Sequence, residues 1–281
     1  MAVNKIRRKI KRIKKINSMM DFWSATKYIV AFFLNVHLYL KPLCKREFTI
    51  KIWNSYVIHL RMYSRDLDFF ESIYIGKFVE GNYIGEYDIE VNDKRFSDIV
   101  DLGANIGLFT VLYAIRYPEK RIISFEPERT NYLLLKKNTK QFKNIKCVQA
   151  GVWYRDHMVK VYPSRVIVKR TGTSSEGAFY IGECDTNDGM NINMGYSLET
   201  IIKKNKLSDI LVKMDVEGAE NEIFCLGKKE WLKECQILII ETHEWLLPET
   251  KMDVVIDKCM KDLQYEKSVS GENKIYIKSD K

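Results

Sequence analysis

Three short segments of this sequence place glycines and acidic residues directly after apolar stretches. The first segment, residues 101–107, reads Asp-Leu-Gly-Ala-Asn-Ile-Gly, and an amphipathic stretch over residues 107–117 follows it. Gly103 and Gly107 let the backbone turn sharply and approach a ligand with no Cβ in the way. A strand, a glycine turn and a helix in this order are typical of a nucleotide-type ligand lying over the first strand of a doubly wound sheet. The segment therefore predicts such a ligand site, with a purely structural turn as the alternative.

The details of this turn indicate which ligand it holds. Dinucleotide-binding folds carry a glycine two positions after the first one. This chain has Asn105 there, and its side chain would crowd a pyrophosphate. S-adenosylmethionine has no phosphate, so its site tolerates the asparagine. We therefore expect an S-adenosylmethionine site that includes Asp101, Gly103, Asn105 and Gly107.

A second acidic residue follows the next apolar stretch at a suitable distance. Residues 121–125 predict a strand, and Glu126 and Pro127 end it, with Glu126 placed 25 positions after Asp101. This separation suits one strand–helix–strand unit, in which an acid at this place accepts hydrogen bonds from ribose hydroxyls. A solvated glutamate at a strand end is the alternative. Together with the glycine turn, the pattern predicts that Glu126 and Pro127 bind the cofactor.

The third segment gathers carboxylates at the end of an apolar strand. Residues 209–214 predict the strand, and Asp215, Glu217 and Glu220 follow it around Gly218. Carboxylates concentrated at a strand end are costly for stability and are usually kept for chemistry. This segment therefore predicts the catalytic part of the site.

In these segments and in others along residues 50–245, the chain resembles the FkbM-type family of S-adenosylmethionine-dependent methyltransferases. The matching segments occur in the order 101–107, 125–127, 131–138, 197–200, 213–220 and 240–243. The resemblance implies an O-methyltransferase that acts on a sugar hydroxyl of a glycan, a glycolipid or a glycosylated metabolite. The stretch 163–194 matches only loosely, so the acceptor pocket expected there is not identified.

Methyl transfer to a hydroxyl benefits from a base, because a base that takes the hydroxyl proton in the transition state lowers the barrier. Asp215, Glu217 and His243 are the candidates, since each is expected at the carboxyl edge of one of two adjacent strands. The alternative for the acids is helix capping, and for the histidine it is simple packing. Amine methylation is disfavoured, because the Asp/Asn-Pro-Pro-aromatic turn of such enzymes is not found after this strand.

No spacing of histidines, cysteines and acids predicts a metal site. Binding of Mg²⁺ by the clustered carboxylates of Asp215, Glu217 and Glu220 stays an alternative, because this ion prefers oxygen ligands. The six cysteines are scattered, which indicates thiols in a reducing compartment such as the cytoplasm.

The net charge of +9 is concentrated at the start of the 281-residue chain. The first fifteen positions hold eight basic residues and no acid, which leaves 38 basic and 37 acidic residues in the remainder. A nearly neutral body does not indicate a nucleic-acid footprint, so no nucleic-acid partner is expected. An RNA methyltransferase stays as an alternative function.

The N-terminal forty residues carry two further signals. Isoleucines recur at helical spacing among the cations of residues 5–16, and residues 28–40 form an apolar run. A membrane span needs about 20 apolar residues, so this run is short. Residues 5–40 therefore predict peripheral contact with an anionic membrane at its cytoplasmic face, where each Lys or Arg contributes about 1 kcal/mol. The alternatives are a helix packed on the enzyme and an RNA-binding tail.

Strands and helices alternate through the rest of the chain. Strands are predicted at 97–101, 121–125, 145–149, 209–214 and 236–241, and helices at 107–117, 128–141, 197–205, 219–226 and 250–263. Extra strands are expected within 159–181 and a terminal hairpin within 267–278. We therefore predict a doubly wound, mostly parallel, seven-stranded α/β sheet of the Rossmann-like class I methyltransferase type. A helical N-terminal appendage would occupy residues 1–45 and the methyltransferase domain residues 46–281. The competing function class is a membrane-surface adaptor with this fold and little or no catalysis.

Overall fold

The computed structural model describes residues 2–36, 47–79, 82–163, 179–184, 192–244 and 248–279. The chain divides into two compact units: unit 1 comprises residues 1–89 with 166–177, and unit 2 comprises residues 90–165 with 178–281. The boundary predicted near residue 45 falls inside unit 1, so it does not coincide with the boundary between the two units. A functional division at residue 45 stays a prediction.

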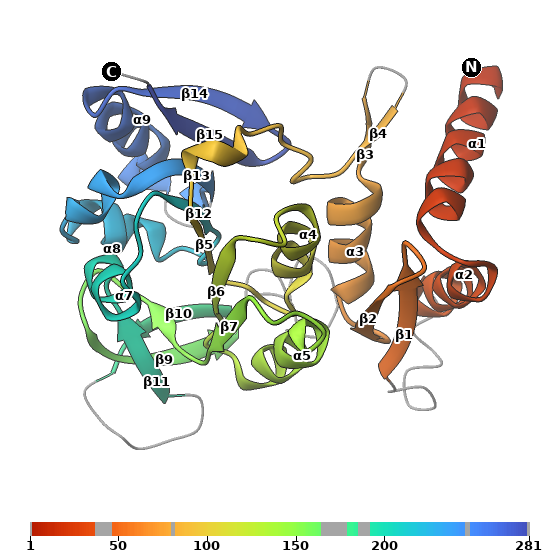
Figure 1. Ribbon diagram of the computed structural model, residues 1–281, viewed down its shortest axis with the longest axis horizontal. Helices are drawn as coiled ribbons and strands as arrows, with labels where there is room; N and C mark the ends of the chain where they lie inside the picture. The colour runs from red at the N-terminus through yellow and green to blue at the C-terminus, as the bar shows by residue number, and fades with distance from the viewer. Residues whose placement is uncertain are drawn as a thin grey trace. The chain divides into compact units, whose positions relative to one another are not determined.

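Unit 2 is built on a seven-stranded sheet (Figure 1). Its strands are, in spatial order, β14 (Tyr265–Ser270), β15 (Asn273–Lys278), β13 (Cys235–Glu241), β12 (Ile210–Met214), β5 (Asp98–Leu102), β6 (Arg121–Phe125) and β7 (Ile145–Val148). The strands from β13 to β7 run parallel, while β15 is antiparallel to both of its neighbours. The sheet is therefore mixed, with the antiparallel part confined to the terminal hairpin that the sequence predicts.

The strand order reverses between β5 and β12. The chain runs from β5 outward to β6 and β7, and then returns to lay down β12 and β13 on the other side of β5. In such open sheets a ligand binds outside the carboxyl ends of the strands at the point of reversal. Both β5 and β12 are buried along their whole length, which explains why their sequences are nearly continuous apolar runs.

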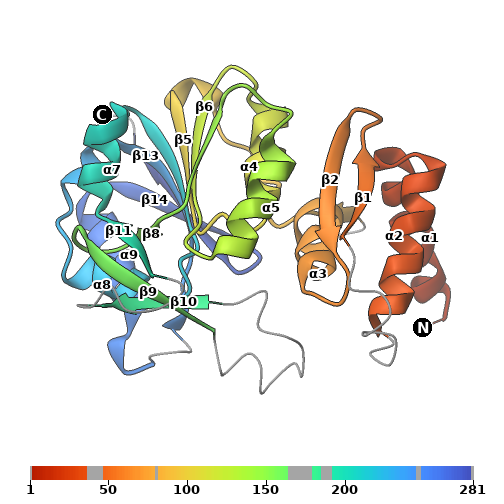
Figure 2. The ribbon, with the colours of Figure 1, turned by 90° about the horizontal axis from the view of Figure 1, so that it is seen from below.

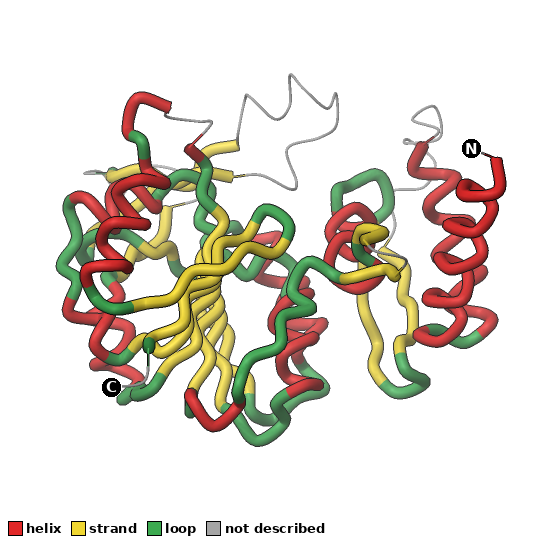
Figure 3. Tube along the Cα trace, turned by 90° about the horizontal axis from the view of Figure 1, so that it is seen from above, coloured by secondary structure: helices red, strands yellow, loops and turns green. Residues whose placement is uncertain are grey.

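Helices cover both faces of this sheet (Figures 2 and 3). One face carries α4 (Leu108–Arg116) and α5 (Arg129–Thr139), and the other carries α7 (Leu198–Asn205), α8 (Glu220–Cys225) and α9 (Met252–Asp262). The side chains of Glu128 and Ser197 accept hydrogen bonds from the first turns of α5 and α7, as expected of N-caps. The bounds of all five helices lie within two residues of the predicted ones.

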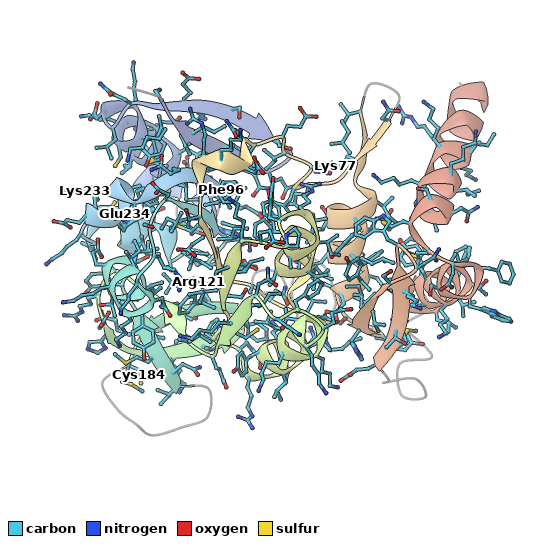
Figure 4. All side chains as sticks on the ribbon, in the orientation of Figure 1. Lys77, Phe96, Arg121, Cys184, Lys233 and Glu234 are labelled. Carbon is cyan, nitrogen blue, oxygen red and sulfur yellow. The ribbon has the colours of Figure 1, made fainter. Side chains whose placement is uncertain are left out.

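The amino ends of the strands are fixed by contacts remote from the expected site. Arg121, which is labelled in Figure 4, starts β6 and pairs with Asp98 at the start of β5 through an Nε–Oδ1 distance of 2.9 Å. This ion pair holds the two strands in register at the edge opposite the glycine turn.

A second sheet of four strands lies in unit 2. Its order is β10 (Phe179–Glu183), β9 (His157–Pro163), β11 (Ile192–Tyr196) and β8 (Gly151–Val152). The extra strands predicted within 159–181 are thus present as β9 and β10, which pair antiparallel. Most of the stretch 163–194, where the acceptor pocket is expected, lies outside the described residues.

Unit 1 combines helices with short strands. It contains α1 (Ala2–Met19), α2 (Phe22–Val36), β1 (Glu47–Ile52), β2 (Tyr56–Arg61), α3 (Asp66–Phe70), the π-helical turn η2 (Glu71–Ile75), β3 (Lys77–Val79) and β4 (Asn82–Ile84). The helical stretch of α3 and η2 ends at Gly76, which adopts a positive φ of 83°. The helix α2 packs on β1, where the Lys51 N–H donates to the Ser24 hydroxyl across 2.8 Å. A separate helical appendage is therefore not confirmed.

The apolar run predicted at 28–40 forms the second half of α2, and its residues 37–40 lie outside the described residues. In the described part of the chain, every helix is too short or too polar to cross a bilayer.

Candidate active site

The turns after β5 and β12 approach each other closely at the reversal of strand order. Gly103 has a φ of +75°, and a Cβ built on it would lie 1.8 Å from the carbonyl oxygen of Asp215. Only glycine allows this approach. Gly107 also has a positive φ, of +86°, and a Cβ there would lie 2.6 Å from Leu135 Cδ1 in α5. The two glycines thus bring the predicted cofactor turn against the predicted catalytic segment and against the following helix α5.

Asp101 lies inside the sheet rather than at its surface. Its side chain is fully buried, its Oδ2 accepts a hydrogen bond from Thr110 across 2.5 Å, and its Oδ1 lies 3.6 Å from Nζ of Lys213. Burial raises the pKa of Asp101 above its ordinary value, against the pull of Lys213 and Thr110. Asp101 therefore pairs with Thr110 of α4 and Lys213 of β12.

Lys213 is a buried cation that links the two predicted halves of the site. Its Nζ donates to the Gly103 carbonyl across 2.8 Å and to Oδ2 of Asp215 across 3.3 Å. Burial lowers the pKa of Lys213, but Asp215 and Asp101 raise it more, so the net shift is upward and the ammonium stays charged. Sequence reasoning did not assign Lys213 a role. The available signal was a single lysine inside a fully buried strand, which has to be paired.

Glu126 joins the glycine turn to the residues that begin α5. Oε2 accepts from the backbone N–H of Asn105 and Oε1 from that of Glu128, each across 2.8 Å. Burial raises the pKa of Glu126 to about 8, although the two N–H donors favour the carboxylate. Pro127, the other predicted residue, accepts a hydrogen bond from the Asn193 amide across 2.9 Å.

Two further acceptors in this region lack donors. Within the described ranges, Oδ1 of Asn105 and Oδ1 of Asp101 are buried and make no hydrogen bond. Asn105 itself takes a left-handed backbone conformation, with a φ of 50°. Buried acceptors without donors are uncommon in proteins, and each calls for an explanation such as a ligand or a water. The glycine turn is thus rich in acceptors, in agreement with a ligand that brings hydrogen-bond donors.

His243 lies at the centre of the carboxylates that follow β12 and β13. Its Nε2 is 3.6 Å from Oε2 of Glu217, 3.7 Å from Oδ1 of Asp215 and 3.8 Å from Oε1 of Glu241. The three residues predicted to be catalytic, Asp215, Glu217 and His243, are therefore brought together. The side chain of His243 is only 5% exposed, whereas those of Asp215 and Glu217 are each 26% exposed. The two carboxylates are accessible to a substrate.

Glu220 orients the ring of His243 through the nitrogen Nδ1. It accepts from Nδ1 of His243 across 2.9 Å, and from the backbone N–H groups of Val216 and Gly218 across 3.2 and 2.9 Å. Burial lowers the pKa of His243, but Glu220, Asp215 and Glu217 together raise it to about 10. The ring is therefore an imidazolium near neutral pH and cannot accept a proton. This differs from the expectation of a general base, which rested on the ordinary pKa of histidine.

The same cluster has the composition of a cation site. One ligand atom each of Asp215, Glu241 and His243 lies within 4.8 Å of the others. A metal ion there would have to displace the imidazolium proton, because a histidine ligand is neutral. Sequence spacing did not indicate this set, since its members come from the ends of two strands.

The fold and this site define the class of protein: an α/β domain of methyltransferase type, with its polar residues at the reversal of strand order. The FkbM methyltransferase domain matches residues 101–267. The chain belongs to this methyltransferase family, and the resemblance drawn from the sequence is confirmed.

The chain is also similar to two methyltransferases of fungi and to one solved structure. Methyltransferase sdnD of Sordaria araneosa is 26% identical over 174 residues, which cover 52% of this chain and 66% of that protein. Methyltransferase 1 of Beauveria bassiana is 29% identical over 203 residues, 58% of this chain and 81% of that one. The crystal structure of methyltransferase FkbM from Methylobacillus flagellatus superposes with a TM-score of 0.45 and 14% identity, over 98% of this chain and 60% of that chain. Of the full length of the Sordaria protein, this chain spans just under two thirds.

Proposed function

We propose that this chain is an S-adenosylmethionine-dependent O-methyltransferase whose acceptor is a hydroxyl of a sugar. The proposal rests on two sets of residues that lie close together where the strand order reverses. One is the acceptor-rich turn at Gly103, and the other is the pair of accessible carboxylates Asp215 and Glu217 beside it.

The residues of the turn fit the cofactor. S-adenosylmethionine supplies an activated methyl group on a sulfonium, and it carries ammonium and hydroxyl donors. The acceptors for these donors are the carboxylate of Glu126 and the buried Oδ1 of Asn105, which lacks a hydrogen bond within the described ranges. Charge-assisted hydrogen bonds of this kind are the strong ones. Gly103 keeps the space above the turn clear of a side chain.

The carboxylates then handle the proton of the acceptor hydroxyl. Asp215 is fixed from two sides, by Lys213 at 3.3 Å and by the His243 ring at 3.7 Å. We assign Asp215 the role of base, with Glu217 binding a neighbouring hydroxyl. His243 balances the negative charge around them, since its pKa is raised to about 10. Positioning an acceptor in line with the methyl group supplies the rest of the rate enhancement.

The identity of the acceptor rests on the family resemblance. A sugar hydroxyl suits a site with several accessible carboxylates, which accept hydrogen bonds from neighbouring hydroxyls. An RNA acceptor is not favoured, because outside the first fifteen residues the chain is nearly neutral. The scattered cysteines favour action in the cytoplasm.

The proposal is tested with the full chain and methyl-labelled S-adenosylmethionine. A panel of free sugars, glycolipids, glycosylated metabolites and RNA is offered as acceptor, and label transfer is compared with that of Asp215→Asn. The matched control is Glu119→Ala, since Glu119 is an exposed acid of unit 2. Label on a sugar oxygen that requires Asp215 supports the proposal. Cofactor binding with no transfer to any hydroxyl would favour the membrane-surface adaptor, and label on RNA would favour the RNA methyltransferase.

A further inference from the structure

The helix α2 is apolar on two faces, and only one of them is covered. The covered face packs within unit 1 through Ala25, Tyr28 and Ala31, which are 7%, 1% and 4% exposed. The opposite face stays in water, and its large apolar side chains are Phe22 (76% exposed), Trp23 (73%), Ile29 (43%), Val30 (50%) and Phe33 (63%). A helix that is apolar all round is normally buried all round.

These five side chains form one continuous surface, here called the outer face of α2. At 3.6 residues per turn, Phe22, Ile29 and Phe33 stack along the helix, and Trp23 and Val30 flank them. The rings of Phe22 and Trp23 meet edge to face, with their centroids 5.6 Å apart. Contiguous apolar patches of this kind mark interaction surfaces, whereas single exposed apolar residues are ordinary.

The adjoining helix α1 supplies positive charge. It has no acidic residue, and the first acid in the chain is Asp21. Two of its cations are engaged within unit 1, since Arg12 pairs with Glu71 across 2.6 Å and Lys15 with Asp88 across 4.0 Å. The exposed cations here include Lys9 and Lys14 on α1 and Lys27 on α2.

The apolar and cationic side chains are also mixed along α1. Ile10 and Ile13 are 49% and 55% exposed and lie between the exposed Lys9 and Lys14. An amphipathic surface with Lys on its polar side and Trp, Phe and Ile on the other is the pattern of helices that lie in the interface of a bilayer. Trp in particular prefers the headgroup level of membranes.

We propose that the outer face of α2 and the exposed side of α1 dock unit 1 on an anionic lipid bilayer. Phe22, Trp23 and Phe33 enter the interfacial layer, and Lys9 and Lys14 contact the headgroups. The positive charge of α1 complements the negative charge of the lipid headgroups, which favours a bilayer over other partners. A second copy of the chain would bring cations against cations, and an RNA strand would leave Ile29 and Val30 without a partner. The proposal does not depend on the methyltransferase reaction.

The structure places the apolar contact differently from the sequence pattern. The run at 28–40 pointed to the second half of α2, whereas the two most exposed apolar side chains of the outer face, Phe22 and Trp23, lie at its beginning. Tyr28, the first residue of that run, is buried, and its ring lies tilted against that of Phe70 with the centroids 5.7 Å apart. A mixture of basic and apolar contacts is the usual route to peripheral attachment, because either signal alone is marginal.

The test is co-sedimentation of the full chain with two kinds of vesicle, pure phosphatidylcholine and phosphatidylcholine with 30% phosphatidylglycerol (about one third anionic lipid). Three variants separate the contributions: Trp23→Gln with Phe33→Gln for the outer face, Lys9→Gln with Lys14→Gln for the charges, and Val254→Gln as control. Val254 is 63% exposed on α9 of unit 2 and matches the outer-face residues in exposure. Circular dichroism and thermal unfolding of each variant show that the fold is kept.

We expect binding to anionic vesicles only. The lysine variant should lose about fivefold in affinity for each charge removed, and the outer-face variant at least about tenfold. Val254→Gln should bind as the parent does, and the parent emission of Trp23, isolated by comparison with Trp23→Phe, should shift to the blue on binding. Equal binding of the folded outer-face variant would overturn the proposal. The proposal would also be overturned if the parent bound no vesicles and instead formed a dimer that the substitution Phe33→Gln dissociates.

Discussion

His243 donates through Nδ1 to Oε1 of Glu220 across 2.9 Å, and this single bond aims its Nε2 at the carboxylates that follow β12 and β13. Glu220 is itself fixed by two backbone N–H groups of the turn between β12 and α8. The ring orientation therefore depends on a buried acid, which is the arrangement that keeps histidines rigid in functional sites. It also makes the charge on the histidine depend on that acid.

The raised pKa of His243 predicts a specific pH dependence of stability. A histidine whose folded pKa of about 10 exceeds its ordinary value of 6.5 contributes stability that is fully present below pH 6.5. That contribution is lost as the pH rises through 10. The difference in free energy of unfolding between the parent and His243→Gln should therefore be largest at pH 6 and shrink steadily toward pH 10. Urea unfolding at pH 6, 8 and 10 measures it. A difference that is constant with pH would show that folding does not raise the pKa of His243.

Glu220→Gln tests the positioning role directly. A glutamine at this position can still accept from Nδ1 of His243 but carries no charge, so the pKa of His243 should fall by one unit or more (about 1.4 kcal/mol per unit). Titration of the imidazole by NMR measures the pKa. We expect cofactor affinity to stay within about threefold, because Glu220 does not line the glycine turn. Glu222→Gln is not a suitable control, since Glu222 is half-buried, and the exposed Glu119→Gln serves instead. An unchanged pKa in Glu220→Gln would remove Glu220 from this role.

Asp215→Asn should lower the turnover number far more than it weakens cofactor binding. Loss of a general base costs about 10²–10⁴-fold in rate, whereas the Lys213 contact to the Gly103 carbonyl, which holds the cofactor turn, does not involve Asp215. Glu217→Gln should raise KM for the acceptor more than it lowers kcat, because it binds a neighbouring hydroxyl. Single-turnover kinetics and calorimetry separate the two quantities. If Asp215→Asn kept near-normal turnover, catalysis here would rest on positioning alone.

The strands and helices of unit 2 could be predicted because their signals are local. Short stretches in β5, β6 and β12 that are mostly apolar identify buried parallel strands, and the acids and glycines that follow them are read directly from the sequence. The meeting of Asp215, Glu217 and His243 followed from the same rule, since parallel strands deliver their carboxyl ends to one edge of the sheet.

The electrostatics of the site could not be predicted in the same way. The register of β12 against β5 places Lys213 between two carboxylates. The path of the turn after β12 brings Glu220 to His243. Neither is encoded in a local pattern. The extent of the outer face of α2 could not be predicted for a related reason, because the sequence shows which residues are apolar but not which of them the rest of unit 1 covers.

Gly103→Ala should disrupt the junction between the two halves of the site. Its Cβ would lie 1.8 Å from the Asp215 carbonyl, and its φ of +75° is unfavourable for alanine. We expect the free energy of unfolding to fall by at least about 2 kcal/mol and cofactor binding to be lost. Gly182→Ala is the matched control, since a Cβ there meets only Tyr162 at 3.6 Å, an ordinary contact. Equal stability of the two variants would show that the turn can rearrange.

Glu126 predicts how cofactor affinity changes with pH. Its pKa of about 8 means that the free chain carries it largely protonated below that value. The hydroxyl donors of the cofactor favour the carboxylate, so binding should release a proton and should tighten as the pH rises from 6 through 8. Calorimetry with S-adenosylhomocysteine, in buffers of different ionisation enthalpy, counts the proton. In Glu126→Gln the affinity should be weaker at pH 9 by about 1.5–3 kcal/mol and should no longer vary between pH 6 and 9. A parent affinity that is flat across this range, with no proton released, would place the ribose hydroxyls away from Glu126.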